Sequence, residues 1–95
     1  MILVDQLAQH AKSPLGPREW CHMVSDSSLI ELHEFAARIG MRREWFQGDH
    51  YDLVASKRSA ALQFGAKPVS SQELVRRMVG ARGDRMRELQ AQDLD

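Results

Sequence analysis

The order of apolar and polar positions predicts three short strands. Residues 2–4 form an apolar run that Asp5 closes, and such a run is typical of a buried strand. Residues 20–24 alternate in a way that suits a second strand, with His22 on the opposite face from its two sequence neighbours. Residues 66–69 suggest a third strand. Because this segment contains a proline, which cannot donate a hydrogen bond to a central ladder, we expect it at the edge of the sheet.

Helical periodicity predicts three helices between and after these strands. The first follows a capping-box sequence at residues 28–31 and ends at Gly40. Its apolar stripe, at the spacing i, i+3, i+4 and i+7, consists of Leu32, Phe35, Ala36 and Ile39. We expect a second helix over residues 56–64. A third is expected over residues 70–79, where another capping box stands at the start.

The remaining segments complete an α/β fold. We expect a helical turn near Leu7, then a loop rich in proline and glycine, and later a loop or short strand over residues 45–52. We expect residues 84–95 to form a charged C-terminal tail or a fourth helix. Together the elements predict one small domain over residues 1–95, with about three short strands covered by three to four helices.

Length and composition exclude several classes of protein. The 95 residues suffice for one hydrophobic core, and no apolar run approaches the roughly 18 residues of a membrane span, so we expect no membrane partner. The first residues lack the basic segment of a signal peptide. Cys21 is the only cysteine, which excludes an internal disulfide and a multi-cysteine zinc site. We therefore expect a cytoplasmic protein.

The net charge is zero, but the charges are unevenly distributed. Residues 1–35 carry a net −3, residues 36–87 a net +6, and the last eight residues a net −3. A basic middle can attract phosphates, and it can equally be a solvated surface balanced by the acidic ends. Charge alone therefore leaves a nucleic acid or nucleotide partner open.

Two histidines stand in chemically mixed segments. His22 lies in the second predicted strand, and His50 lies in the aromatic block at residues 45–52. The chain has no H-E-x-x-H sequence and no histidine pair at i, i+4, so a metal site needs residues from distant segments. Imidazole and carboxylate together suit a transition metal, although an acid after a strand is often only a turn residue. The candidate ligands of a divalent metal cofactor are Asp5, His22, His50 and Asp52.

The triplet His50-Tyr51-Asp52 has a second interpretation. On an extended segment, His50 and Asp52 share one face and Tyr51 points the other way. A carboxylate beside an imidazole orients the ring and raises its pKa, as in general-base pairs. The alternative is a loop that side-chain hydrogen bonds hold in place, with Tyr51 buried.

Two basic segments are candidates for contact with a phosphate-bearing ligand. Lys57 and Arg58 stand at the expected start of the second helix, where unpaired backbone N–H groups favour anions. Arg42 and Arg43 precede Trp45, and arginines beside aromatic rings are common in sites for single-stranded nucleic acid. Trp45 and the phenylalanine after it can instead pack beneath the preceding helix.

Four sequence blocks are distinctive when taken together. They are Trp20-Cys21-His22-Met23, Glu31-Leu32-His33-Glu34-Phe35-Ala36, Trp45-Phe46-Gln47 with His50-Tyr51-Asp52, and Ser56-Lys57-Arg58. With these blocks the chain resembles a family of short bacterial and phage proteins whose domain has no assigned function. The resemblance covers most of the chain from Trp20 to near Met78 and supplies no activity. It implies a family site composed of His22, His50, Tyr51, Asp52, Lys57 and Arg58.

Three functions fit these observations. The first is a domain that binds a phosphate-bearing ligand such as nucleic acid or a nucleotide. Its candidate ligand-binding residues are His22, Trp45, His50, Tyr51, Asp52, Lys57 and Arg58. The second is a metal-dependent phosphoesterase or nuclease that uses the four candidate metal ligands. The third is a non-enzymatic protein-interaction module anchored by the aromatic block.

Overall fold

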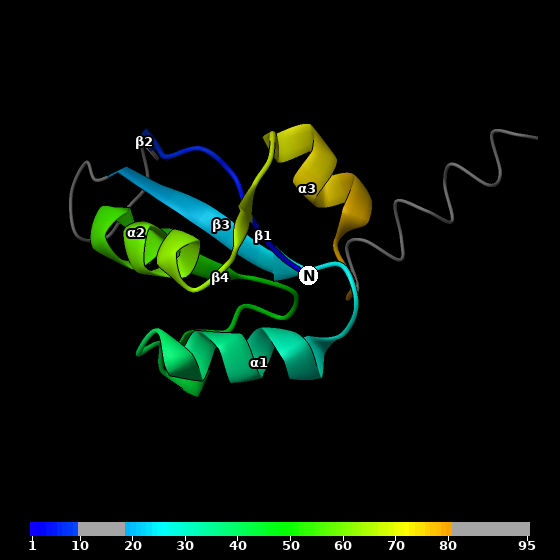
Figure 1. Ribbon diagram of the computed structural model, residues 1–95. Helices are drawn as coiled ribbons and strands as arrows, with labels where there is room; N and C mark the ends of the chain where they lie inside the picture. The colour runs from blue at the N-terminus through cyan, green and yellow to red at the C-terminus, as the bar shows by residue number, and fades with distance from the viewer. Residues whose placement is uncertain (10–18, 81–95) are drawn as a thin grey trace, which may run out of the picture.

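A computed structural model describes residues 1–9 and 19–80, which form a mixed sheet with helices on both faces (Figure 1). The five strands of the described residues are β1 (Ile2–Val4), β2 (Ala8–Gln9), β3 (Glu19–Ser25), β4 (Tyr51–Val54) and β5 (Lys67–Pro68). β3 is the central strand, because it pairs antiparallel with β1, β2 and β4. β5 runs parallel to β1 at the edge of the sheet, where its proline predicts it.

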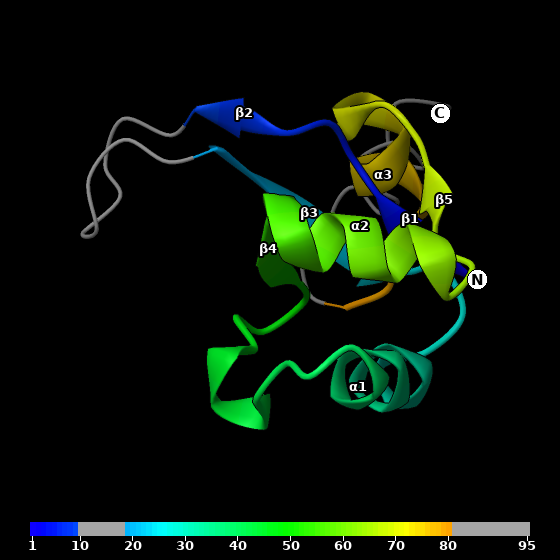
Figure 2. The same cartoon turned by 60° about the vertical axis from the view of Figure 1, so that its left-hand side comes forward.

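The helices cover the two faces of the sheet unequally. They are α1 (Leu29–Arg38), α2 (Ala55–Gln63) and α3 (Ser71–Arg77), with a short 3-10 helix, η1 (Arg43–Trp45), after α1. α1 and α2 lie on one face and α3 on the other (Figures 1 and 2). The core cluster on the α1 and α2 side includes Val4, Cys21, Met23, Leu32 and Tyr51. The smaller cluster beneath α3 consists of Leu3, Val24, Leu74 and Met78.

Both faces of β1 are therefore buried, which explains why its sequence is apolar throughout rather than alternating. None of the helices in the described part of the chain is long and apolar enough to cross a membrane.

Serine side chains begin two of the helices, as the capping-box sequences predict. Ser28 Oγ accepts a hydrogen bond from the Glu31 N–H at 3.0 Å, and Ser70 Oγ accepts one from the Glu73 N–H at 3.1 Å. In a full capping box, the Glu31 carboxylate would accept a hydrogen bond from the Ser28 N–H. At α1 the Ser25 hydroxyl stands between them: its Oγ accepts from the Ser28 N–H at 3.1 Å and donates to the Glu31 carboxylate at 2.8 Å. The start of α1 is thus fastened to the end of β3.

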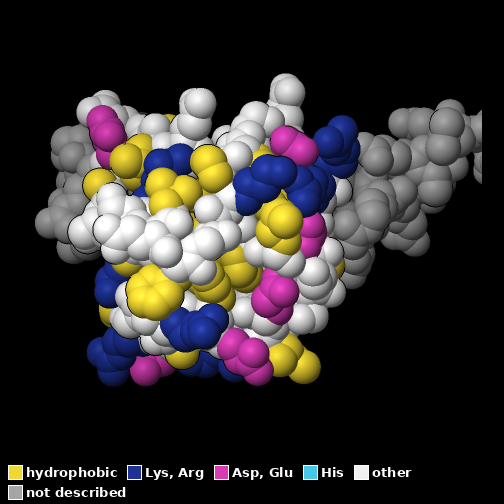
Figure 3. Space-filling model, in the orientation of Figure 1, with side chains coloured by type: hydrophobic (Ala, Val, Ile, Leu, Met, Phe, Trp, Pro, Cys, Tyr) yellow, Lys and Arg dark blue, Asp and Glu magenta, His cyan; other side chains and the backbone are white. Residues whose placement is uncertain are grey.

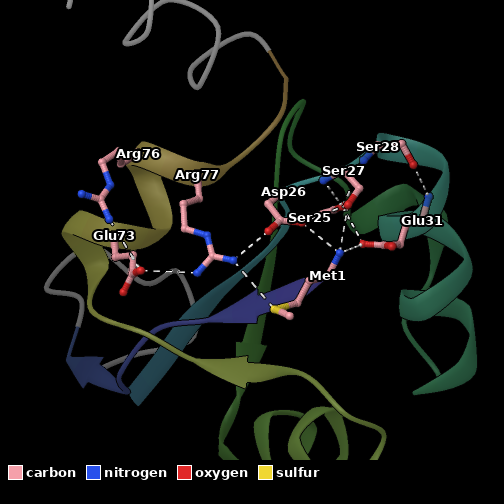
Figure 4. A network of polar contacts seen from close by, with 9 residues as sticks. All are labelled: Met1, Ser25, Asp26, Ser27, Ser28, Glu31, Glu73, Arg76 and Arg77. Atoms are coloured by element: carbon pink, nitrogen blue, oxygen red, sulfur yellow. Dashed lines mark hydrogen bonds and ion pairs between the residues drawn. The ribbon is translucent and has the colours of Figure 1, made fainter.

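Basic and acidic side chains lie side by side over α3 (Figure 3), and a polar network joins this helix to the starts of β1 and α1 (Figure 4). Arg77 donates to Asp26 Oδ2 at 2.8 Å and to Glu73 Oε1 at 3.3 Å. The Met1 amino group donates to Asp26 at 2.9 Å and to Glu31 at 2.7 Å. The Met1 amine, and after it Arg77, lowers the pKa of Asp26 to about 2. The positive charges of the arginines on α3 are therefore compensated by carboxylates of the protein itself.

The α/β class predicted from the sequence is confirmed, but the described residues contain five strands rather than about three. The predicted helical turn near Leu7 is wrong, because Ala8 and Gln9 form β2 and pair with Trp20 and Glu19. β3 extends past the end of β1, so the backbone N–H and C=O groups of its first residues need hydrogen-bond partners from another segment. The local sequence of residues 7–9 does not reveal that this segment supplies them. The predicted charged tail or helix over residues 84–95 lies outside the described part of the chain.

The bounds of α2 and α3 differ by one or two residues from the predicted ones. α2 begins at Ala55, directly after β4 and one residue earlier than expected, and no side chain caps its start. α3 ends at Arg77, two residues early, because Met78 has extended backbone with ψ of 144°. The N–H of Val79 then donates to the Ser25 carbonyl at 2.9 Å, so the chain after α3 returns to the sheet.

The aromatic block divides between η1, a turn and β4. Tyr51 is buried in the core, and its hydroxyl lies 2.9 Å from Nδ1 of His33 on α1. The Phe46 ring packs edge-on against His33, with a centroid separation of 4.5 Å. Trp45, in contrast, is 46% exposed. Of the two adjacent rings, Phe46 therefore packs against the core and Trp45 does not.

Candidate metal centre

The candidate metal ligands come from segments that the sheet brings together. Asp5 directly follows β1, and its N–H donates to the carbonyl of His22 on β3 at 3.3 Å. His22 is the register partner of Asp52 on β4, so these two side chains stand on adjacent strands. His50 precedes β4 by one residue, and its ring centroid lies 5.3 Å from that of His22. Residues far apart in the sequence thus form one cluster on the face that α3 covers.

Asp5 sets the orientation of the His22 ring. The carboxylate is buried; its Oδ1 accepts from the His22 N–H at 2.6 Å, and its Oδ2 lies 2.9 Å from His22 Nδ1. The hydroxyl of Ser71, at the start of α3, donates to the same Oδ2 at 2.9 Å. A carboxylate at Nδ1 holds the ring proton on that nitrogen, which makes Nε2 the nitrogen that can ligate a metal.

His50 lies between two carboxylates. Its Nδ1 is 2.6 Å from Asp49 Oδ1, and its Nε2 is 3.2 Å from Asp52 Oδ1. The Gln47 side-chain amide donates to the other oxygen of Asp52 at 2.7 Å, and the Gln47 N–H donates to the His50 carbonyl at 2.9 Å. The turn before β4 is therefore closed by hydrogen bonds. His22 and His50 both have a carboxylate at Nδ1, which is the usual arrangement around metal-ligating histidines.

The electrostatics of the cluster favour a positive charge beside His50. Burial raises the pKa of Asp5, but hydrogen bonds from His22 outweigh it and the pKa lies below its usual 3.8. For His50, the hydrogen bond to Asp52 raises the pKa, burial acts against it, and Asp49 adds to the rise, so the pKa lies above 6.5. Positive charge at this position, on a protonated imidazole or on a bound cation, compensates the two carboxylates.

One separation within the cluster is close to that of two ligands on a tetrahedral metal ion. One ligand atom from each of His22, His50 and Asp52 lies within 4.8 Å of the others. The 3.2 Å between His50 Nε2 and Asp52 Oδ1 is close to the roughly 3.4 Å that separates two ligands bound about 2.1 Å from a tetrahedral ion. Two imidazoles and one carboxylate occur as the ligand set of catalytic zinc sites, in which water takes the fourth position.

A cavity of about 60 Å³ adjoins the cluster beneath α3. Its polar wall consists of Asp5, His22, His50 and Ser71. Its apolar wall is formed by side chains of β3 and α3. The His22 side chain is 34% exposed and that of Asp52 is 17% exposed, so solvent reaches the cluster from one side and a small ligand has space on the other.

The other residues predicted for the site lie outside the cluster or at its border. Lys57 Nζ donates to a backbone carbonyl at the C-terminal end of α1 at 2.7 Å, where a cation is favourable. Arg58 Nε donates to the backbone carbonyl of Asp5 at 2.9 Å. Tyr51 points into the core on the opposite side of the sheet, and Trp45 is exposed on η1. Of these, only Arg58 contacts a member of the cluster directly.

Three further residues of the cluster do not stand out in the sequence. Asp49 adjoins His50 in a Gly-Asp turn, where an acid is common for reasons of turn geometry alone. Ser71 directly follows Ser70, which caps α3, so the sequence indicates a helix start there and gives no sign that the Ser71 hydroxyl donates to Asp5. Gln47 contributes only because the turn closes on Asp52, and no local pattern predicts this closure.

We expect Gly80→Ala to disturb the site as well as the fold. Gly80 has φ of 113°, and a Cβ there would lie 2.9 Å from Cβ of Asp49. Gly65, with φ of 105°, has nothing within 4 Å of such a Cβ, so Gly65→Ala is a matched control that adds only backbone strain, about 1–2 kcal/mol. Urea unfolding should show a larger loss for Gly80→Ala, and the NMR titration of His50 should change in that variant alone. Equal losses with an unchanged titration would contradict this expectation.

Comparison with known proteins identifies the family without supplying an activity. No curated protein and no solved structure matches the chain. One family model matches residues 2–81, a range that includes every residue of the cluster. The family resemblance inferred from the sequence blocks is therefore confirmed. The chain belongs to the family described as protein of unknown function, DUF4031.

Proposed function

We propose that the protein binds a divalent transition-metal ion through His22, His50 and Asp52 and uses it to hydrolyse a phosphate ester. The observation that carries the proposal is the pairing of each histidine Nδ1 with a carboxylate, Asp5 for His22 and Asp49 for His50. This pairing fixes the tautomer, orients the ring and increases the basicity of the ligating nitrogen. Two histidines oriented in this way beside a carboxylate support a metal centre better than a structural role.

The charge of the cluster favours a cation over a bare phosphate. Asp5, Asp49 and Asp52 contribute three carboxylates around two histidines. The side chains of Lys57 and Arg58, which were candidates for phosphate contact, donate to backbone carbonyls within the protein. A phosphate alone would approach like charge, whereas a metal ion would reverse the local sign. Direct phosphate binding is therefore the weaker alternative.

The surroundings of the cluster suit hydrolysis of an anionic ester. A zinc ion with three protein ligands lowers the pKa of a water in its fourth position to about 7, which supplies a nucleophile at neutral pH. The adjoining cavity offers space for a small group of the substrate. A cytoplasmic location, which the single cysteine favours, belongs to the same proposal.

The protein-interaction alternative has less support. It requires an apolar patch that includes the rings of both Trp45 and Phe46. The Phe46 ring packs against His33 and Tyr51, with centroid separations of 4.5 Å and 5.5 Å. The exposed part of the block is therefore one ring rather than a broad apolar surface.

Metal binding is the first test of the proposal. Thermal unfolding of the metal-stripped protein is measured with Zn²⁺, Co²⁺, Mn²⁺ and Mg²⁺. A ligand at about 100 times its dissociation constant adds about 2.7 kcal/mol to the free energy of unfolding. For a domain of this size, each kcal/mol raises the midpoint by roughly 4–8 °C. We expect a rise with the transition metals, its loss in Asp52→Asn, and no change in the exposed control Glu34→Gln.

Hydrolysis of bis(p-nitrophenyl) phosphate is the second test, with the metal that stabilises the fold most. We expect a rate that depends on the metal, is abolished by a chelator and is lost in Asp52→Asn. Stabilisation without hydrolysis would retain the metal site and reject the phosphoesterase. If no metal stabilises the protein, the whole proposal is wrong.

A further inference from the structure

We infer that the substrate is single-stranded nucleic acid, and that η1 and its flanking residues form a platform on which one base stacks beside the metal cluster. The platform consists of Arg42, Arg43, Trp45 and Phe46. The inference rests on the proposed phosphoesterase function and adds its substrate class.

The exposed ring of Trp45 belongs to a surface that the fold holds in place. The Arg42 guanidinium carbon lies 6.0 Å from the centroid of the Trp45 ring, and that of Arg43 lies 6.0 Å from the centroid of Phe46. Phe46 in turn packs edge-on against His33 of α1. One ring of the pair is thus anchored in the core, while its neighbour presents an aromatic face with a cation on it.

The platform is joined to the metal cluster by a short stretch of chain. Gln47 follows Trp45 by two residues, a span of at most about 7 Å. The Gln47 side chain donates to Asp52, a candidate metal ligand, at 2.7 Å. The backbone at Trp45 therefore lies close in the chain to the residue that contacts Asp52. In a polymeric substrate, a base can occupy the platform while a neighbouring phosphate reaches the cluster.

The chemistry of the platform selects an unpaired, anionic polymer. Stacking on an aromatic side chain requires a base whose face is free, which a single strand provides at every nucleotide. Arg42 is 65% exposed and pairs with the 72% exposed Glu44 at 3.4 Å, a surface contact that is worth little. A phosphate oxygen can therefore replace Glu44 as the partner of Arg42. Arg43 supplies a second cation for the backbone of the strand.

Fluorescence anisotropy with a labelled oligonucleotide of about 12 nucleotides tests the platform. The metal is kept in place, and an oligonucleotide with a non-hydrolysable backbone prevents cleavage during the measurement. We expect Trp45→Ala to weaken binding roughly 5- to 100-fold and Trp45→Phe to restore part of the affinity. Phe64→Ala is the matched control, because Phe64 is 55% exposed at the end of α2 and lies outside the platform. Arg42→Ala should reduce the dependence of affinity on salt, and Glu44→Gln should tighten binding.

The outcomes separate this inference from the proposed function. Failure of the oligonucleotide to bind, equal weakening in Trp45→Ala and Phe64→Ala, or equal affinity for duplex and single strand would overturn the platform. None of these results alters the metal-dependent stabilisation or the hydrolysis of the small diester. Conversely, loss of oligonucleotide affinity only in the platform variants supports the binding surface even if the small diester is not hydrolysed.

Discussion

The Asp5→Ala variant is expected to lose about 2–4 kcal/mol of folding stability and most of its metal affinity, because buried donors lose their acceptor. Asp5 is 2% exposed and accepts hydrogen bonds from the His22 N–H, the His22 ring and the Ser71 hydroxyl. Removing the carboxylate leaves these groups without an acceptor at a position that the fold buries. The His22 ring also loses the contact that holds its proton on Nδ1.

The Asp5→Asn variant should separate stability from metal binding. The amide oxygen can still accept from the His22 N–H at the position of Oδ1, so the amide nitrogen takes the place of Oδ2 beside His22 Nδ1. That nitrogen donates, so His22 Nδ1 must accept and its proton moves to Nε2. A protonated Nε2 cannot ligate a metal. We therefore expect a smaller loss of stability than in Asp5→Ala, with metal affinity still reduced by about 10–100-fold or more.

Urea unfolding and zinc titration of the two variants check these expectations. Ser71→Ala is the graded control, because it removes a single donor to Asp5 Oδ2 and should cost only about 0.5–1.5 kcal/mol. Wild-type zinc affinity in Asp5→Asn would show that Asp5 does not set the tautomer of His22. A stability loss in Asp5→Ala no larger than that in Ser71→Ala would show that the buried carboxylate contributes little to the fold.

Without metal, the protein is expected to lose stability as the pH rises through the folded-state pKa of His50. Asp52 and Asp49 hold that pKa above 6.5, so the protonated imidazole stabilises the folded state. Its contribution is fully present below the unfolded-state value of 6.5 and is lost as the pH rises through the folded value. Metal binding has the opposite dependence, because it requires the neutral imidazole. Stabilisation by Zn²⁺ should therefore grow over the pH range in which the metal-free protein weakens.

Midpoints of thermal unfolding from about pH 6 to about pH 9, with chelator or with Zn²⁺, test both trends. The His50→Gln variant should lose the decline seen with chelator. It should also lose the zinc-dependent rise, which is worth about 2.7 kcal/mol at 100 times the dissociation constant. A decline that persists in His50→Gln would assign the titration to another group. A zinc effect that persists there would remove His50 from the ligand set.

Helix starts and buried strands could be predicted from the sequence because they depend on neighbouring residues. Ser28 and Ser70 each cap a helix three residues before a glutamate, within reach of local backbone N–H groups. The strand at residues 2–4 was evident because its apolar run must be buried. β2 was missed because Ala8 and Gln9 owe their extended conformation to the partner strand β3 and not to their own propensity.

In the candidate site, too, some features follow from neighbouring residues and others only from the packing of distant segments. The residue types that suit a metal, and the shared face of His50 and Asp52, follow from the sequence, because side-chain alternation is a local property of a strand. That His22 stands opposite Asp52 depends on the register of β3 and β4. Register is decided by which side chains the packed sheet buries. Only the tertiary structure could therefore assign Asp5 to His22, because this hydrogen bond joins segments that folding alone brings together. Asp49 is the sequence neighbour of His50, and the conformation of the turn brings its carboxylate to His50 Nδ1.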